Sequence, residues 1–147
     1  MKALIQRVSE AAVTVGSSLI GNIGRGMLIF LGVEKGDTEK DGDYIAKKIA
    51  GLRIFEDAQG KMNRSVKESH GEVLVVSQFT LASDCRKGNR PSFDRAEVPE
   101  KAKKLYMHVI EKLKQQDIPT ASGAFAEYME VRLSNDGPVT IFLDSRE

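Results

Sequence analysis

The chain has 147 residues, which suits a single domain over residues 1–147, and its 22 lysines and arginines against 21 aspartates and glutamates give a formal charge of +1. A chain that bound nucleic acid mainly by neutralising phosphates would carry a basic excess, so any such contact must be local and shape-based. With 41% hydrophobic and 29% charged residues the chain can bury a core, which excludes global disorder.

The first part of the chain is predicted to be β-structure. Residues 3–8 and 11–15 are rich in apolar and β-branched side chains and predict two strands, and Gly16–Ser18 predicts a hairpin turn. Residues 27–33 are almost wholly apolar and predict a central strand buried on both faces. The glycines within residues 21–26 precede that strand and join no strand to a helix, which favours a turn over a phosphate-binding loop.

A first helix is predicted to begin near Thr38. Thr38 and Asp41 have the spacing of a capping box, with aspartate in place of the usual glutamate. An apolar stripe follows at helical spacing: Ile45, Ile49 and Leu52. After the helix we expect a charged loop over residues 56–71 and a second buried strand over residues 72–76.

A second helix is predicted from Pro99, which suits a first helical turn. One apolar face recurs at three-and-four spacing: Ala102, Leu105, Tyr106, Val109, Ile110 and Leu113. His108 falls off this face among lysines and glutamates, so we interpret it as a solvated side chain and not as a catalytic base. Residues 128–133 and 139–143 predict two further strands joined by a turn at Asn135–Pro138.

Polar side chains follow the predicted strand 72–76. Ser77, Gln78 and Thr80 flank Phe79 where the chain leaves the sheet, which is where open α/β sheets bind ligands. Backbone N–H groups turned outward at this point could stabilise the oxyanion of an acyl transfer. The plainer interpretation is that serine and threonine simply end a strand.

Two other segments are candidate parts of a site. Gly137–Pro138 lies between strands, where a cis bond would form a rigid backbone device that contacts a ligand without a side chain. An ordinary trans turn is the alternative. The loop over residues 84–95 carries Arg86, Lys87 and Arg90, which could position phosphates, although the same charges suit a solvated loop.

Cysteine and histidine are scarce in this chain. Cys85 is the only cysteine and the histidines are His70 and His108, which excludes an internal disulfide and the usual zinc sites. A carboxylate-only magnesium site stays open, and Cys85, which has no identifiable base, is interpreted as an inert thiol. Because no apolar run approaches the roughly 20 residues that span a bilayer, we expect a cytoplasmic protein with no membrane contact.

The chain resembles the D-aminoacyl-tRNA deacylases over its whole length. SQFTLA at Ser77–Ala82 and NDGPVT at Asn135–Thr140 match that family's SQFTL and NxGPVT signatures, in the same order along the chain. The start of the chain, MKALIQRV at residues 1–8, also matches. The resemblance implies an α/β fold with a mixed, barrel-like sheet and two main helices.

The same resemblance implies a homodimeric hydrolase without a metal or other cofactor, with its active sites at the dimer interface. It would cleave the ester at the 3′ end of D-aminoacyl-tRNA, and of glycyl-tRNA mischarged on tRNA(Ala), to free amino acid and tRNA. In this family the glycine–proline bond is cis and enters the partner's pocket. Gly137 and Pro138 are thus implied to exclude L-amino acids by a backbone clash, and Arg7 to help hold that motif.

The catalytic groups implied by the resemblance are Ser77, Gln78, Phe79 and Thr80. Thr80 occupies the place of the family's candidate nucleophile, but no histidine, lysine or carboxylate is adjacent to it as a base. We therefore expect backbone N–H groups around Phe79 and Thr80 to bind the ester carbonyl, while Ser77 and Gln78 shape the pocket. The ribose 2′-hydroxyl or a water would assist the reaction.

Two other functions are compatible with the residues. One is a non-catalytic RNA-binding module that uses the loop from Arg86 to Arg95. The other is a small-molecule hydrolase that acts on free D-amino-acid esters and needs no tRNA body.

Overall fold

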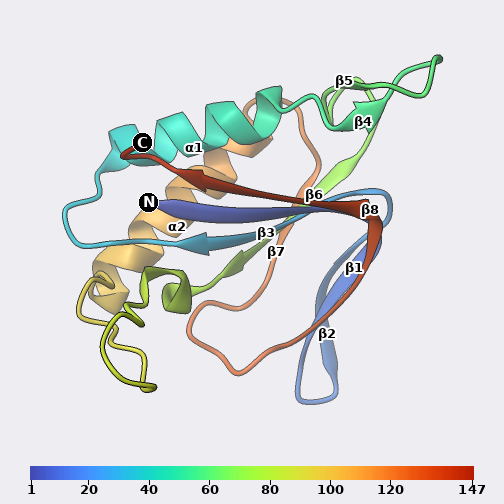
Figure 1. Cartoon of the computed structure of the whole chain (residues 1–147). Helices are drawn as coiled ribbons and strands as arrows, with labels where there is room; N and C mark the ends of the chain where they lie inside the picture. The colour runs from blue at the N-terminus through green and yellow to red at the C-terminus, as the bar shows by residue number, and fades with distance from the viewer.

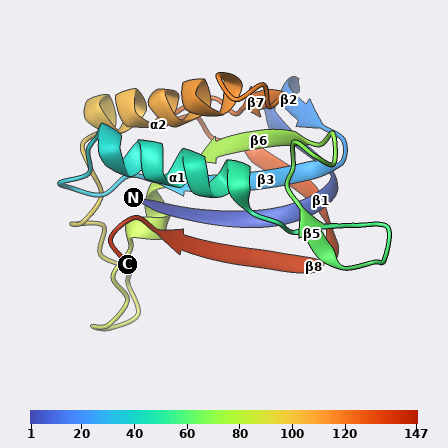
Figure 2. The same cartoon turned by 90° about the horizontal axis from the view of Figure 1, so that it is seen from above.

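The computed structural model describes all residues from 1 to 147. A curved six-stranded sheet is accompanied by two helices and a small two-stranded sheet (Figure 1). Seen from above, the helices lie side by side over one face of the large sheet, and its other face carries no helix (Figure 2). The predicted α/β fold with two main helices is confirmed.

Two long strands form the centre of the sheet. β1 (Lys2–Val15) and β8 (Glu130–Asp144) run antiparallel to each other. On its other edge β1 pairs first with β3 (Gly26–Gly32) and then with β2 (Ser18–Ile23). β1 therefore has a partner on both edges along most of its length.

The remaining strands of the large sheet make it mixed and strongly curved. β3 pairs in parallel with β6 (Glu72–Ser77), and β6 pairs in parallel with β7 (Thr120–Ser122). The two ends of the sheet approach each other, because a Cβ added at Gly21 of β2 would lie only 2.8 Å from the Ser122 carbonyl oxygen. Only glycine permits this approach. The sheet is thus nearly closed and barrel-like, as expected.

Both helices are present where the sequence predicts them. α1 (Glu39–Gly51) follows Thr38, whose backbone N–H and hydroxyl both donate to Asp41 Oδ2, at 2.8 and 2.9 Å. α2 (Pro99–Lys114) begins with its proline in the first turn. Their apolar stripes bury against the covered face of the sheet, which forms the main core. 

Four predictions of secondary structure are wrong. The two strands expected within residues 3–15 are one strand, because the polar stretch between them stays paired with β8. The strands predicted over residues 128–133 and 139–143 likewise do not form a hairpin, since residues 130–133 and 139–143 both belong to β8. The turn at 21–26 shortens to two residues because β2 runs to Ile23. The loop 56–71 contains short antiparallel pairing, between β4 (Phe55–Glu56) and β5 (Met62–Arg64).

His108 is not the solvated side chain that its sequence neighbours predict. Its side chain is only 20% exposed, and its Nε2 lies 2.8 Å from Oδ1 of Asp43 on α1. The two helices pack closely at this point, since a Cβ added at Gly42 would lie 2.9 Å from His108 Cδ2. The pattern of a single helix does not reveal this hydrogen bond, because the partner is supplied by the other helix.

Candidate functional site

The Ser77–Ala82 segment leaves the sheet at the end of β6. The Gln78 N–H still donates to the Leu31 carbonyl of β3 at 2.8 Å, and the chain then enters a single 3₁₀ turn, η1 (Phe79–Ala82). This turn lies directly on Gly32, because a Cβ there would be 2.9 Å from both the Gln78 carbonyl oxygen and the Leu81 Cβ. The motif is thus placed by close backbone packing against β3.

Two backbone donors at the start of η1 have no acceptor within the chain. The Leu81 N–H donates to Gln78 and the Ser83 N–H to Thr80, but the N–H groups of Phe79 and Thr80 have no acceptor. This is the usual condition of the first donors of a helical turn. Two adjacent free amides beside a cavity form a site that can bind a developing negative charge.

The Thr80 hydroxyl has one hydrogen-bond partner. Gln78 Nε2 donates to Thr80 Oγ1 at 2.5 Å, and no histidine, lysine or carboxylate forms a hydrogen bond with that oxygen. A threonine nucleophile requires a base to accept its proton. No such base is hydrogen-bonded to Thr80 in the structure, and none is adjacent to it in the sequence.

A groove of about 520 Å³ lies beside this segment, within the size range of small-ligand sites. Ser77, Gln78 and Phe79 line it, whereas Thr80 does not. Twelve of its 17 lining residues are hydrophobic, so the groove suits an apolar group more than a charged one. Residues 125–129 also line the groove, and the sequence patterns marked only 128 and 129 of them, as part of an expected strand.

Four titratable side chains line the groove, and two of them, Tyr106 and Glu97, are poor general bases, whereas Glu127 and Tyr128 are exposed. The Tyr106 hydroxyl donates to the Val75 carbonyl at 2.8 Å, and burial raises the pKa of Tyr106 to about 12, so it stays protonated. Lys101 Nζ lies 2.7 Å from Glu97 Oε2 and holds the pKa of Glu97 below its usual value. A carboxylate that is already paired in this way is a weak base at neutral pH.

The Asn135–Thr140 segment is a bulge within β8 and not a turn. Gln6 pairs with Thr140 and Val8 with Asn135, so the chain advances two residues along β1 and five along β8. The Asn135 side chain closes the base of this bulge, accepting from the Val139 N–H at 2.8 Å and donating to the Val139 carbonyl at 3.1 Å. At its exposed tip the Gly137–Pro138 peptide bond is cis.

Arg7 lies opposite the bulge and is 6% exposed. Its Nε donates to the Asp136 carbonyl at 2.8 Å, and its Nη1 donates to the Ile54 carbonyl at 2.7 Å. The Asp136 carboxylate lies 3.8 Å from the same Nε. One buried guanidinium therefore joins the bulge to the chain segment that leads into β4.

The two signature segments do not meet within one chain. Ser77 is in register with Leu31 and, through it, with Ala3 of β1, whereas the bulge faces Arg7. Gly137 and Pro138 do not line the groove. Figure 1 shows η1 and the bend of β8 at opposite ends of the sheet.

The basic loop lies at the η1 end of the molecule. Arg86 is held by Asp84, which accepts from both the Arg86 backbone and its guanidinium, and this pairing lowers the pKa of Asp84. Lys87 and Arg90 are exposed and form no ion pair. Of the three predicted cations, two are therefore free to bind an anion and one orders the loop.

No group of three or more histidine, cysteine, aspartate or glutamate side chains is arranged to hold a metal ion. No helix is long and apolar enough to cross a membrane. The Cys85 thiol is exposed, and Ser83 Oγ is its only hydrogen-bond partner, at 4.0 Å.

The chain is similar to known proteins over nearly its full length. Residues 4–144 match the family described as D-Tyr-tRNA(Tyr) deacylase. The chain is 58% identical to the D-aminoacyl-tRNA deacylase of Geobacter sulfurreducens, covering 99% of this chain and 96% of that one. It is 54% identical to the protein of the same name from Thermodesulfovibrio yellowstonii, covering 99% and 100%.

Two solved structures are also similar. One is titled c-Myc DNA Unwinding Element Binding Protein; its TM-score is 0.92 at 43% identity, with 98% of each chain covered. The other is described as a probable eukaryotic D-amino acid tRNA deacylase, with a TM-score of 0.82 at 15% identity and 97% of each chain covered. At that identity the second likeness concerns the fold alone.

The Gly137→Ala substitution should destabilise the bulge. Gly137 has a φ of +149°, and a Cβ there would lie 2.8 Å from Val139 Cγ2 and 2.9 Å from the Val139 nitrogen. We expect the free energy of unfolding, measured in urea, to fall by about 1–3 kcal/mol. Gly51→Ala is the control, because a Cβ there meets no atom within 4 Å. Equal stability of the two variants would contradict this geometry.

Proposed function

The chain belongs to the D-Tyr-tRNA(Tyr) deacylase family and is a D-aminoacyl-tRNA deacylase, and we propose that backbone groups from two copies of it form each active site. The substrate is the ester between a D-amino acid and the 3′ end of tRNA, and the products are the free amino acid and tRNA. Glycyl-tRNA mischarged on tRNA(Ala) is a second substrate, because glycine has no side chain to be excluded. The enzyme thereby proofreads chirality in translation, in the cytoplasm.

The proposal rests on the pair of free amides of Phe79, which lines the groove, and of Thr80, the residue after it. In the proposed reaction a water attacks the carbonyl carbon of the ester, and the carbonyl oxygen becomes an oxyanion that both amides bind. The bond to the ribose 3′ oxygen then breaks as that oxygen takes up a proton. Ser77 and Gln78 shape the pocket. The neighbouring 2′-hydroxyl positions the water, takes up the proton that the water loses and passes its own proton to the leaving 3′ oxygen.

No metal or other cofactor takes part in this mechanism. An aminoacyl ester is already activated by the adjacent ribose hydroxyl, so positioning and oxyanion binding supply the remaining acceleration. Thr80 contributes its amide, while its hydroxyl, held by Gln78, keeps the turn in shape. This division of roles fits a Thr80 hydroxyl that has no base among its hydrogen-bond partners.

We infer that chirality is read by Gly137–Pro138 of a second copy. The bulge is exposed and lies at the far end of the sheet from its own groove, so it can reach a groove only on another molecule. A rigid backbone wall would clash with the side chain of an L-amino acid and leave room for that of a D-amino acid. Selection by such a clash does not depend on affinity for the rest of the substrate.

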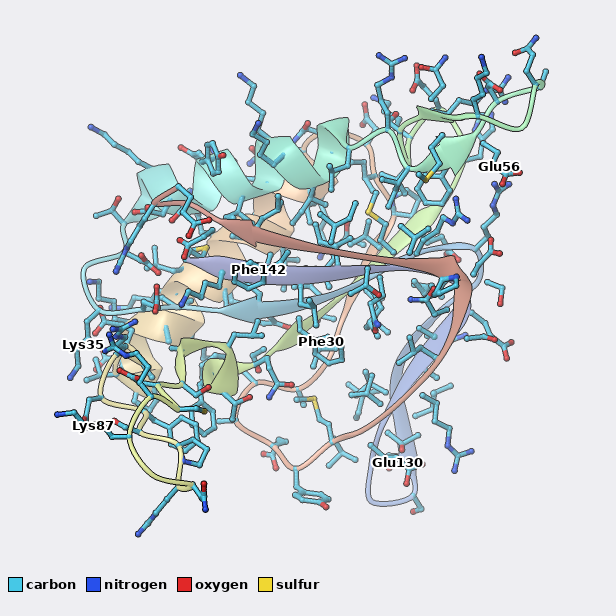
Figure 3. All side chains as sticks on the ribbon, viewed as in Figure 1. Phe30, Lys35, Glu56, Lys87, Glu130 and Phe142 are labelled. Carbon is cyan, nitrogen blue, oxygen red and sulfur yellow. The ribbon has the colours of Figure 1, made fainter.

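The uncovered face of the sheet supports a homodimer. Phe142, Leu4 and Phe30 are in register across β8, β1 and β3, and Phe142 is 50% exposed. Figure 3 labels Phe142 and Phe30 on the face that carries no helix. The row continues to Val76, which lines the groove, so a partner seated on this face would border the site.

Two further elements complete the proposed site. Arg7 is a positioning residue that fixes the bulge from below through the Asp136 carbonyl. Lys87 and Arg90 contact phosphates near the 3′ end of the tRNA, while Arg86 keeps the loop ordered through Asp84. A local basic loop is sufficient for this purpose in a chain whose formal charge is +1.

The substrate assignment predicts that the protein releases D-tyrosine from D-tyrosyl-tRNA and leaves L-tyrosyl-tRNA intact, measured as loss of acid-precipitable label. A non-catalytic nucleic-acid-binding protein would protect or ignore both esters. A small-molecule hydrolase would cleave free D-tyrosine esters as fast as the charged tRNA. Either of these results would overturn the proposal.

The mechanism predicts a small effect of Thr80→Ala on single-turnover deacylation. Since the hydroxyl only supports the turn, the rate should fall by about 10²-fold or less, whereas loss of a nucleophile should lower it by about 10⁴-fold or more. Ser83→Ala is the control, because it removes a hydroxyl close in sequence at a residue that carries neither of the two free amides. A loss of about 10⁴-fold or more in Thr80→Ala alone would show that the Thr80 hydroxyl is the nucleophile.

A further inference from the structure

The chain segment around β4 and β5, residues 53–67, forms an arm that carries unpaired cations. Arg53, Lys61 and Arg64 are exposed, and none of them lies in an ion pair. Arg25 reaches the same region, with its guanidinium 5.5 Å from the centre of the Phe55 ring, and it too has no carboxylate partner. Four guanidinium or ammonium groups thus gather around one short hairpin.

Asp57 in the arm and Glu68 just beyond it form no ion pair with these cations, although the charge of Arg64 helps to lower the pKa of both carboxylates. Asp57 accepts from the backbone N–H of Gln59 at 2.9 Å and of Lys61 at 3.0 Å, which lowers the pKa of Asp57. Glu68, just beyond the arm, accepts from the Ser65 N–H at 2.7 Å. Glu56 is exposed (Figure 3).

The arm has a defined shape. Arg53 Nε donates to the Asn63 carbonyl at 2.9 Å, which ties the two sides of the hairpin together and leaves the two terminal nitrogens of Arg53 free. Lys67 is not part of the free set, because its Nζ lies 3.5 Å from the Asp117 carboxylate. A preordered set of cations with free donors is suited to a phosphate backbone.

The arm and the Gly137–Pro138 bulge share one support. Arg7 donates to Asp136 in the bulge and to Ile54 at the base of the arm. Figures 1 and 2 both show the arm at the end of the molecule away from η1. The arm is therefore remote from the groove of its own chain, and its position relative to the bulge is fixed.

We propose that the arm binds the phosphates of the tRNA acceptor stem whose 3′ end occupies the groove of the other subunit. This inference rests on the proposed function, because it requires the bulge to enter the partner's groove. When the bulge docks in the partner's groove, the arm is brought to the same subunit. The cations of the arm then lie beside the tRNA strand that leads out of that groove. In this arrangement the other subunit supplies each active site with both the Gly137–Pro138 bulge and the phosphate-binding arm.

The first test reverses two cations of the arm with the Lys61→Glu/Arg64→Glu variant, whose control is Lys40→Glu/Lys47→Glu on α1, two exposed lysines without ion pairs. On D-tyrosyl-tRNA at moderate salt, kcat/KM should fall roughly tenfold through KM with kcat unchanged, and the slope of log(kcat/KM) against log salt should shrink by about 2. The control should keep the wild-type values. An unchanged salt slope in the arm variant would overturn the proposal.

The second test asks which subunit the arm serves. In mixed dimers, one subunit carries Phe79→Pro, which removes an amide donor, so that only the other groove works. Arm reversal on the Phe79→Pro subunit should raise KM for tRNA, whereas reversal on the subunit with the working groove should not. A raised KM only when the reversal is on the subunit with the working groove would show that the arm serves its own chain, which contradicts the proposal. Weakened dimerisation in native mass spectra would show that the arm contacts protein, which also contradicts it. Failure of the proposed function itself appears separately, as wild-type protein that does not distinguish D- from L-tyrosyl-tRNA.

Discussion

The positions of the Gly137–Pro138 bulge and of the arm depend on the hydrogen bonds of the buried Arg7 guanidinium. Arg7 is almost inaccessible to solvent, and it satisfies its charge with two backbone carbonyls and a carboxylate 3.8 Å away. Leaving such a charge unpaired in the interior would destabilise the fold by roughly 3–5 kcal/mol, so the carbonyls of Asp136 and Ile54 are held in place as firmly as the arginine is. A lysine could not reach both, because it offers a single point charge instead of a planar fork. The bulge and the arm are for this reason one rigid unit.

In the proposed site, backbone groups take the roles that side chains have in many enzymes. Two histidines and one cysteine leave little material for a conventional catalytic centre, and none of the three lines the groove. Two amides at the start of η1 and the peptide groups at the tip of the bulge can perform the tasks that a triad and a side-chain wall perform elsewhere. Such groups do not titrate near neutral pH and do not change rotamer, so the proposed oxyanion site and the proposed wall are both preorganised.

Local patterns predicted the features that depend on neighbouring residues in the chain. The capping box at Thr38, the buried stripe of α2 and the apolar strands β3 and β6 are all where the sequence indicates, because each signal is local. The β8 prediction failed because Asn135–Pro138 has the composition of a turn, and only its pairing with β1 shows that the chain continues in the same direction. The Asp43 partner of His108, the groove wall at residues 125–129 and the link from Arg7 to Ile54 all join distant segments, so no local pattern could show them.

The central claim is that each active site combines the groove of one copy with the bulge of another. A crystal structure of the protein with a non-hydrolysable D-tyrosyl-adenosine analogue tests it most directly. We expect the analogue's carbonyl oxygen to lie within hydrogen-bond distance of the Phe79 and Thr80 amides, and Gly137–Pro138 of a second copy to contact its Cα. An analogue enclosed by a single chain, with Gly137–Pro138 exposed to solvent, would contradict the account.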